Sequence, residues 1–247
     1  VLGSLRTTGE FISNPFGLPT NGIQWENYSS ILGQNSFWLA FGNSLLISLS
    51  TTFLAVAIAS MIAFPLSRLV FPGRTLVFNY ITLGLLFPLV VAIIPVYIQL
   101  RSLGLIDTYW GVILAQVTFS IPMNTVILRS FFRTIPVELE DASYIDGCGY
   151  VGFFWHILLP ISRPVLVAIA VLQFIASWNE YLLPLIILSD SSTWPLPLGI
   201  MQYQGQYQTD WARIMAYVTL LMLPAIAFYA MTERFIVKGL TAGALKG

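Results

Sequence analysis

Two sets of polar residues at helical spacing, inside apolar runs, are the first candidates for chemistry in this sequence. One set holds Gln116, Ser120 and Asn124 at i, i+4 and i+8, and the other holds Gln173, Ser177 and Glu180 at i, i+4 and i+7, with Asn179 beside it. Side chains at this spacing share one face of a helix. Because amides, hydroxyls and a carboxylate exchange hydrogen bonds with a hydroxyl-rich solute, we predict that these residues line a substrate pathway. The alternative is that they bond neighbouring helices to each other.

The remaining residues with reactive side chains give little reason to expect catalysis. Cys148 and His156 are the only cysteine and histidine, and neither has a second ligand at a useful spacing, which predicts no metal site and no catalytic nucleophile. The sequence has no Gly-x-x-x-x-Gly-Lys-Ser/Thr phosphate loop, so the chain is expected neither to bind a cofactor nor to act as an enzyme. Trp178 and Tyr181, beside the second stripe, are expected to offer flat apolar faces to the ring of a solute.

The composition places these residues in a membrane. Of the 247 residues, 57% are hydrophobic and only 9% are charged, whereas soluble domains average about 25% charged residues. A water-facing surface cannot be built from so few charges, so the lipid bilayer is the expected environment. Lysine and arginine together number 11, as do aspartate and glutamate, so there is no basic excess to attract phosphates and nucleic-acid binding is excluded.

Long apolar runs predict the elements that position the stripes. A membrane-spanning helix needs roughly 20 mostly apolar residues. Five runs qualify, near 38–66, 76–100, 111–133, 164–187 and 211–236. Because these runs are continuous and not alternating, they favour helices over barrel strands. The predicted fold class is therefore an all-α polytopic membrane protein with five transmembrane helices in this chain.

The basic residues predict the orientation, because short loops rich in lysine and arginine stay in the cytoplasm. Eight of them fall on one side: Arg68, Arg74, Arg129, Arg133, Arg163, Arg234, Lys238 and Lys246. The C-terminus and a loop over 134–163 are then cytoplasmic, and Val1 is outside. Since the chain opens without an initiator methionine, we expect one more transmembrane helix before Val1, making six in the full protein. Residues 1–36 are predicted to be an external loop and connecting segment, and 37–247 the transmembrane domain.

The cytoplasmic loop is longer than the 2–8 residues that usually join bundle helices. Its sequence predicts two short helices, the first from Pro136 to Asp146-Gly147 and the second from Val151 to Leu159 with Phe153 and Ile157 on an apolar face. One interpretation is a hairpin lying on lipid headgroups, but such helices favour lysine and arginine and this one is acidic. A protein partner is the better interpretation. The predicted docking residues are Glu138, Glu140, Asp141, Ala142, Tyr144, Ile145, Asp146, Gly147, Phe153 and Ile157.

This loop carries a specific resemblance. The run from Glu140 to Gly147, followed by Ile157-Leu158-Leu159-Pro160, resembles the EAA loop of ABC importer permeases, with Asp141-Ala142-Ser143 in the Glu-Ala-Ala place. The run 178–181 (Trp-Asn-Glu-Tyr) and the tail 239–247 are similar to the carbohydrate-uptake branch, which includes the smaller membrane subunit of the maltose transporter. The chain departs from the family pattern where Asp141 shortens the acidic side chain by one methylene, and where Ser143 and Cys148 replace alanines.

The resemblance implies a complete transport system around this chain. It implies a permease-type helix bundle in the prokaryotic cytoplasmic (inner) membrane, paired as a heterodimer with a second permease subunit. A cytoplasmic ATPase dimer would bind ATP and Mg²⁺ and receive the EAA loop, and an extracytoplasmic solute-binding protein would deliver a sugar or oligosaccharide for transport by alternating access. In maltose-like members the larger permease makes most sugar contacts, so the stripes here can shape the cavity without binding the solute. An ion-gradient-driven secondary transporter is the alternative, but it needs mid-membrane carboxylates and only Glu180 lies near.

Overall fold

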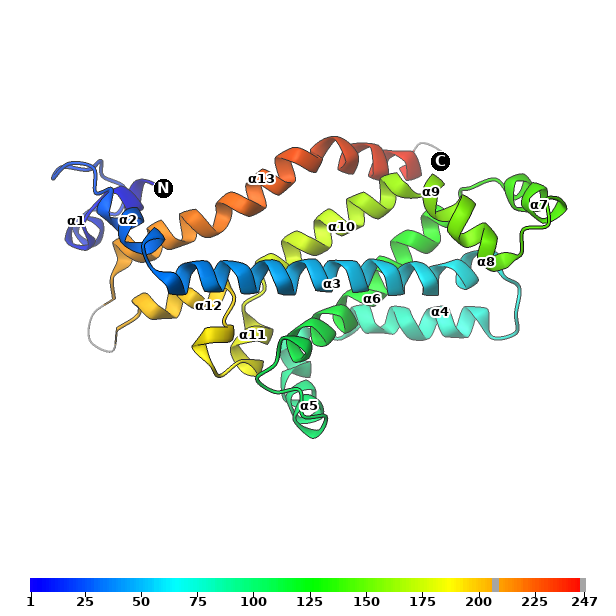
Figure 1. Cartoon of the computed structure of the whole chain (residues 1–247), viewed down its shortest axis with the longest axis horizontal. Coiled ribbons are helices and arrows are strands. Elements are labelled where there is room, and N and C mark those ends of the chain that lie inside the picture. The colour runs from blue at the N-terminus through cyan, green and yellow to red at the C-terminus, as the bar shows by residue number, and fades with distance from the viewer. Residues whose placement is uncertain (206–208, 245–247) are drawn as a thin grey trace.

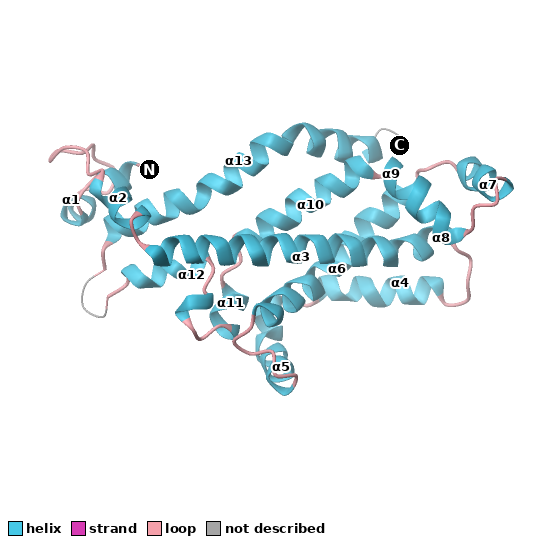
Figure 2. Cartoon of the chain, in the orientation of Figure 1, coloured by secondary structure: helices cyan, strands magenta, loops and turns pink. Residues whose placement is uncertain are grey.

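The computed structural model describes residues 1–205 and 209–244, with side chains for 1–205 and 209–230. The described chain consists of helices and loops (Figures 1 and 2), with one isolated bridge between Gln204 and Thr209 and no other extended pairing among these residues. The α-helices are α1 (Thr8–Ser13), α2 (Glu26–Leu32), α3 (Asn35–Arg68), α4 (Arg74–Leu83), α5 (Leu89–Ser102), α6 (Tyr109–Phe132), α7 (Val137–Ile145), α8 (Tyr150–Phe153), α9 (Leu159–Ile161), α10 (Arg163–Trp178), α11 (Leu182–Ile187), α12 (Leu196–Gly199) and α13 (Trp211–Ala244).

Three helices are long and apolar enough to cross a bilayer by themselves. They are α3, α6 and residues 211–230 of α13, and two bent helix pairs bring the possible spans to five. At 1.5 Å per residue, the 34 residues of α3 extend for roughly 50 Å, which exceeds the roughly 30 Å of hydrocarbon in a bilayer. The all-α membrane fold predicted from composition is therefore confirmed.

The second apolar run is broken, although the sequence analysis treated it as continuous. A short 3₁₀ helix, η2 (Gly84–Leu86), follows α4, and the chain then bends by 105° into α5. The break lies at Phe87-Pro88, where Phe87 has extended backbone angles. Proline lacks an N–H and disfavours helical angles in the residue before it, which favours a break here, although Pro65 and Pro122 lie inside the continuous helices α3 and α6.

The fourth run is also broken, and its boundaries are wrong. The helix α10 ends at Trp178, and α11 is a separate short helix after Asn179–Tyr181. At its other end α10 joins the segment Tyr150–Ile161 at a bend of 75°. By length and composition, Tyr150–Ile161 and α10 together qualify as one bent candidate span, and the predicted continuation of the helix to residue 187 is wrong because α11 is separate.

The centre of the bundle is built on close helix contact. The long helix α3 packs against α6 and α10, and α13 packs on α10 (Figure 1). Ala55, Ala59 and Ala63 of α3 are fully buried. Small side chains at such positions let helix backbones approach closely, which is how membrane helices gain van der Waals contact.

The two ends of the bundle carry different segments (Figure 1). One end, called the α7 end, holds α7, the last turn of α3 and the last turn of α13. The opposite end, called the α1 end, holds α1, α2 and the start of α13. Residues 1–36, predicted as a loop, contain helices α1 and α2, and α1 begins at a capping box formed by Thr7 and Glu10 that the sequence analysis missed. The predicted cytoplasmic C-terminus, residues 245–247, lies outside the described residues.

Candidate functional site

The two predicted polar stripes meet across a cavity between α6 and α10. The cavity has a volume of about 350 Å³, and six of the seven predicted pathway residues line it: Gln116, Ser120, Asn124, Gln173, Ser177 and Glu180. Its other lining residues are apolar, among them Leu89 at the start of α5. Asn179 does not line it, because its side-chain amide is exposed and donates to the carbonyl of Ile175 at the end of α10. We call this cavity the polar groove.

Hydrogen bonds join the two stripes in pairs. The hydroxyl of Ser177 donates to Oε1 of Gln116, and Nδ2 of Asn124 donates to Oε1 of Gln173 at 3.3 Å. Both pairs connect α10 to α6, so part of the hydrogen-bonding capacity does bond neighbouring helices, as the alternative interpretation held. All four side chains are buried.

One buried side-chain amide of the groove donates no hydrogen bond among the described residues. The Nε2 atom of Gln116 is buried and has no hydrogen-bond partner among the described residues. A buried donor without an acceptor costs free energy unless something else accepts from it. Gln116 is one of the residues that line the groove, so this unpartnered donor belongs to the groove wall.

Glu180 has a structural task at the edge of the groove. Its Oε1 atom accepts from the backbone N–H groups of Leu182 and Leu183, at 2.9 and 3.2 Å, and so caps the first turn of α11. Two N–H groups that a helix start leaves unpaired are satisfied in this way. The ring of Trp178 is not available to a solute, contrary to prediction: it is buried, stacks on Phe174, and its indole N–H donates to the carbonyl of Leu221.

The loop predicted to dock a partner lies at the α7 end. Its first helix, α7, ends just before a glycine. We call residues 134–163 the coupling segment. Beyond Asp146, Gly147 has φ of +80°, and the N–H groups of Gly147 and Cys148 donate to the carbonyls of Tyr144 and Ser143. This pattern is a Schellman motif, in which a left-handed residue after the helix satisfies its last carbonyls. The predicted stop at Asp146-Gly147 is confirmed.

The second half of the coupling segment is less regular than predicted. It begins at Tyr150 as α8, passes through a π-helical turn at Phe154–Leu158, and ends as α9. The helical segment continues past its predicted end at Leu159, because Pro160 lies in the first turn of α9, where a missing N–H is tolerated. Phe153 and Phe154 pack on Phe64 of α3, so most of this apolar face covers the chain's own bundle.

A buried ion pair attaches the coupling segment to the bundle. Nη1 of Arg68, the last residue of α3, lies 3.5 Å from Oε2 of Glu140 in α7, and both side chains are less than one tenth exposed. Nη2 of Arg68 also donates to the carbonyl of Phe132, the last residue of α6, and to the carbonyl of Ile135. The hydroxyl of Tyr144 donates to Oε1 of Glu140 at 2.8 Å. Burial, and then this hydrogen bond to a carboxylate, raise the pKa of Tyr144 above its ordinary value.

Comparison with known proteins decides the family. Residues 55–238 match the family described as "Binding-protein-dependent transport system inner membrane component". The chain belongs to this family of importer permeases. It is 33% identical to the diacetylchitobiose uptake system permease protein NgcG of Streptomyces coelicolor, over 100% of this chain and 82% of that protein. It is 35% identical to the trehalose transport system permease protein SugB of Mycobacterium tuberculosis, over 91% of this chain and 83% of that protein.

A solved structure agrees with the fold of this permease. The crystal structure of a bacterial ABC transporter for import of the acidic polysaccharide alginate superposes with a TM-score of 0.81 at 20% identity, covering 94% of this chain and 87% of the other. The resemblance read from the EAA-like run is therefore confirmed. The protein is a multi-pass membrane permease of a binding-protein-dependent importer.

The permease divides its predicted docking residues between two faces. Glu140 and Phe153 are buried against the bundle, and Tyr144 and Ile157 are partly buried. The exposed members are Glu138, Asp141, Ala142, Ile145, Asp146 and Gly147. The sequence analysis missed Arg68, which fixes the inner face. In the sequence, Arg68 is recognisable only as a basic residue at the end of the first apolar run, and it served only to predict the orientation.

Proposed function

We propose that this permease carries a sugar or oligosaccharide and that its polar groove contacts the solute directly. Relatives named for diacetylchitobiose, trehalose and arabinooligosaccharides support the substrate class. The observation that carries the direct contact is the buried, unpartnered Nε2 amide of Gln116 on the groove wall. A hydroxyl-rich solute supplies acceptors for such N–H groups and donors for nearby amide and carboxylate oxygens.

The groove is one half of a pathway in this proposal. It lies on the face of α6 and α10 that also meets the start of α5, and apolar residues complete its wall. Lipid tails cannot satisfy its polar groups, so a second permease subunit is expected to close it as a heterodimer. An extracytoplasmic solute-binding protein delivers the solute at the α1 end.

Energy enters at the α7 end, which we place in the cytoplasm together with the C-terminus. The exposed face of α7 docks on an ATPase dimer, which binds ATP and Mg²⁺, so this chain has no catalytic role of its own. The Arg68–Glu140 ion pair joins α7 to α3, and the Arg68 bonds to Phe132 and Ile135 join it to α6. A displacement of α7 would thus move both helices, and the groove lies on one of them. None of the comparisons supports ion-gradient-driven transport.

The groove is tested with one substitution and a matched control. Gln116→Leu removes the unpartnered amide, and with it the Oε1 acceptor of the Ser177 hydroxyl, while nearly keeping the size of the side chain. Thr118→Val changes an exposed hydroxyl on α6 whose bond among the described residues lies within its own helix. In cells carrying the complete transporter, depletion of labelled sugars from the medium should fall about tenfold for Gln116→Leu, the loss expected for one hydrogen bond. It should stay unchanged for Thr118→Val. Equal depletion by both variants would show that Gln116 does not contact the solute. If the wild type depleted no sugar, the proposed substrate class would be wrong.

The docking face is tested separately by co-purification. Ile145 is 87% exposed in the last turn of α7, and Val70 is 94% exposed between α3 and α4 at the same end. Ile145→Asp should abolish recovery of an ATPase subunit with the permease, whereas Val70→Asp should leave recovery intact. Loss of recovery for Val70→Asp alone would place the docking surface on the α3–α4 connection.

A further inference from the structure

Three arginines gather beside the coupling segment without any part in the function described so far. Arg74 is the first residue of α4, while Arg129 and Arg133 lie at the end of α6, which α4 contacts. Arg74 and Arg133 are the charged groups that act on the guanidinium of Arg129. We call these three residues the arginine cluster.

The cluster uses only a small part of its hydrogen-bonding capacity inside the protein. Nε of Arg129 donates to the carbonyl of Leu66, and Nη1 of Arg74 donates to the carbonyl of Leu69, both at 3.0 Å. Each guanidinium carries five N–H donors, so most of them remain. Arg133 is exposed and makes no side-chain hydrogen bond within the described part of the chain.

Among the residues whose side chains are described, no carboxylate forms an ion pair with the cluster. The ion pairs between described residues are Arg68–Glu140 and Arg213–Asp210, and neither includes a member of the cluster. Arg129 is also held in place, because its Cζ atom lies 3.8 Å from the centre of the Phe78 ring. The cluster is therefore an oriented group of three positive charges that lacks an anion.

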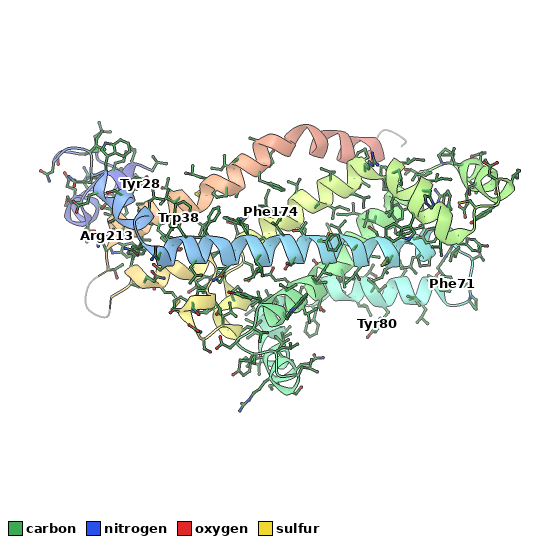
Figure 3. The ribbon with its side chains drawn as sticks, in the orientation of Figure 1. Tyr28, Trp38, Phe71, Tyr80, Phe174 and Arg213 are labelled. Carbon is green, nitrogen blue, oxygen red and sulfur yellow. The ribbon has the colours of Figure 1, made fainter. Side chains whose placement is uncertain are left out.

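The surface next to the cluster is apolar and faces away from the bundle. No residue of α4 is buried, and its exposed side chains include Leu76, Tyr80 and Leu83. Figure 3 shows Tyr80 projecting from α4 on the side away from the other helices. The first turn of α4 contains no acidic residue and no side-chain cap, so the positive end of the helix adds to the arginine charges.

We propose that the arginine cluster binds the phosphate of an anionic phospholipid in the leaflet at the α7 end, with the acyl chains lying along α4. Guanidinium groups match phosphate oxygens in geometry and charge. An apolar helix face directly beside the charges suits a molecule with a phosphate and two hydrocarbon chains. An acidic protein surface would leave that face unused, which is why the lipid is the favoured occupant.

The experiment is a lipid titration of the assembled transporter, purified in a non-ionic detergent and followed by native mass spectrometry. Phosphatidylglycerol should bind the wild type more tightly than phosphatidylcholine, and added inorganic phosphate should not displace it. Arg133→Gln and Arg74→Gln should each weaken phosphatidylglycerol binding about tenfold, the effect expected for loss of one charge-assisted hydrogen bond to the phosphate. Arg133→Lys, which keeps the charge, should bind nearly as the wild type does.

Arg163→Gln is the matched control, since Arg163 is another exposed arginine at the α7 end and begins α10. It should bind phosphatidylglycerol as the wild type does. Because Arg133 makes no side-chain hydrogen bond among the described residues, Arg133→Gln also tests the site without disturbing the end of α3. The proposal is overturned if Arg133→Gln and Arg163→Gln weaken binding equally, or if both lipids bind alike. It is also overturned if the cluster variants lose the ATPase subunit while their lipid binding is unchanged.

Discussion

The two ends of the bundle each hold a carboxylate that organises a segment outside the spanning helices, but with different partners. At the α7 end, Glu140 pairs with Arg68 of α3 and accepts from the hydroxyl of Tyr144. At the α1 end, Glu10 has only neutral donors, the backbone and hydroxyl groups of Thr7 and Thr20 and the backbone N–H of Asn21.

The difference lies in what each carboxylate connects. The contacts of Glu10 are all with near neighbours in the chain, so they shape residues 7–21 without joining them to a spanning helix. Glu140 contacts the last residue of α3, Arg68, which in turn donates to the carbonyls of Phe132 at the end of α6 and of Ile135 just after it. Under the proposed function, α7 transmits movement and therefore needs a contact of the kind that Glu140 makes, whereas the contacts of Glu10 only shape residues 7–21. Four predictions test this contrast.

The largest effect is expected at Glu140. Glu140→Ala leaves the guanidinium of Arg68 buried without its carboxylate, and removing one partner of a buried ion pair costs about 3 kcal/mol. Glu138→Ala changes an exposed glutamate on the same helix and should cost less than about 0.5 kcal/mol. Thermal unfolding of the purified permease and proteolysis of residues 134–163 measure both. Equal stability of the two variants would show that the ion pair does not anchor the coupling segment.

The second effect is expected at Gly147, where the backbone turns after α7. Its φ of +80° is costly for a residue with a Cβ, so Gly147→Val should destabilise the end of α7 by about 2 kcal/mol. A Cβ at this position would meet no atom within 4 Å, so the cost is conformational, and Gly147→Asn should be milder. Hydrogen exchange measures whether the Schellman motif is intact. The Gly147 and Cys148 amides report it in the wild type, and the Cys148 amide reports it in the variants. Gly149→Ala, at a φ of −78°, is the control and should leave exchange unchanged.

Gly147 also shows where prediction from the sequence succeeds. The stop of α7 at Asp146-Gly147 was predictable because it depends on residues adjacent in the chain. The stripe on α6 was predictable because helical spacing alone puts Gln116 and Asn124 on one face. The polar groove follows from that spacing and its partner stripe on α10, although its volume does not.

The inner face of the coupling segment was not predictable from local signals. Whether Glu140 faces a partner or the bundle depends on Arg68, which is far away in the sequence. The burial of Phe153 depends in the same way on its contact with Phe64. The breaks at Phe87-Pro88 and after Trp178 were missed for a different reason. Hydropathy averaged over many residues is lowered little by one proline, such as Pro88, or by two polar residues, such as Asn179 and Glu180, so neither break interrupts the apolar run.

The third effect is expected at Thr8, which joins the α1 end to α13. Its hydroxyl donates to Oδ1 of Asp210 at 2.8 Å and accepts from the N–H of Ala212 at 3.2 Å. Thr8→Val removes both bonds and should lower the local stability by about 1 kcal/mol, seen as faster hydrogen exchange at Ala212. Ser29→Ala is the control, because the Ser29 hydroxyl bonds only to Glu26 within α2. Unchanged exchange at Ala212 in Thr8→Val would mean that packing alone holds the two segments together.

The smallest effect is a pH dependence confined to the α1 end. Hydrogen bonds, first from the Thr20 hydroxyl and then from the Thr7 backbone, lower the pKa of Glu10 from 4.5 to about 2. A carboxylate whose pKa is lower in the folded state stabilises that state above pH 4.5, and this contribution is lost as the pH falls toward 2. Corrected for the intrinsic exchange rate, protection of the Asn21 amide should be constant above pH 4.5 and decline between pH 4.5 and 2. Glu10→Gln cannot titrate and should show no such decline. A decline that persists in Glu10→Gln would assign the pH dependence to another group. The charge of Glu10 would then contribute nothing to stability, and the α1 end would not depend on a carboxylate as the α7 end does.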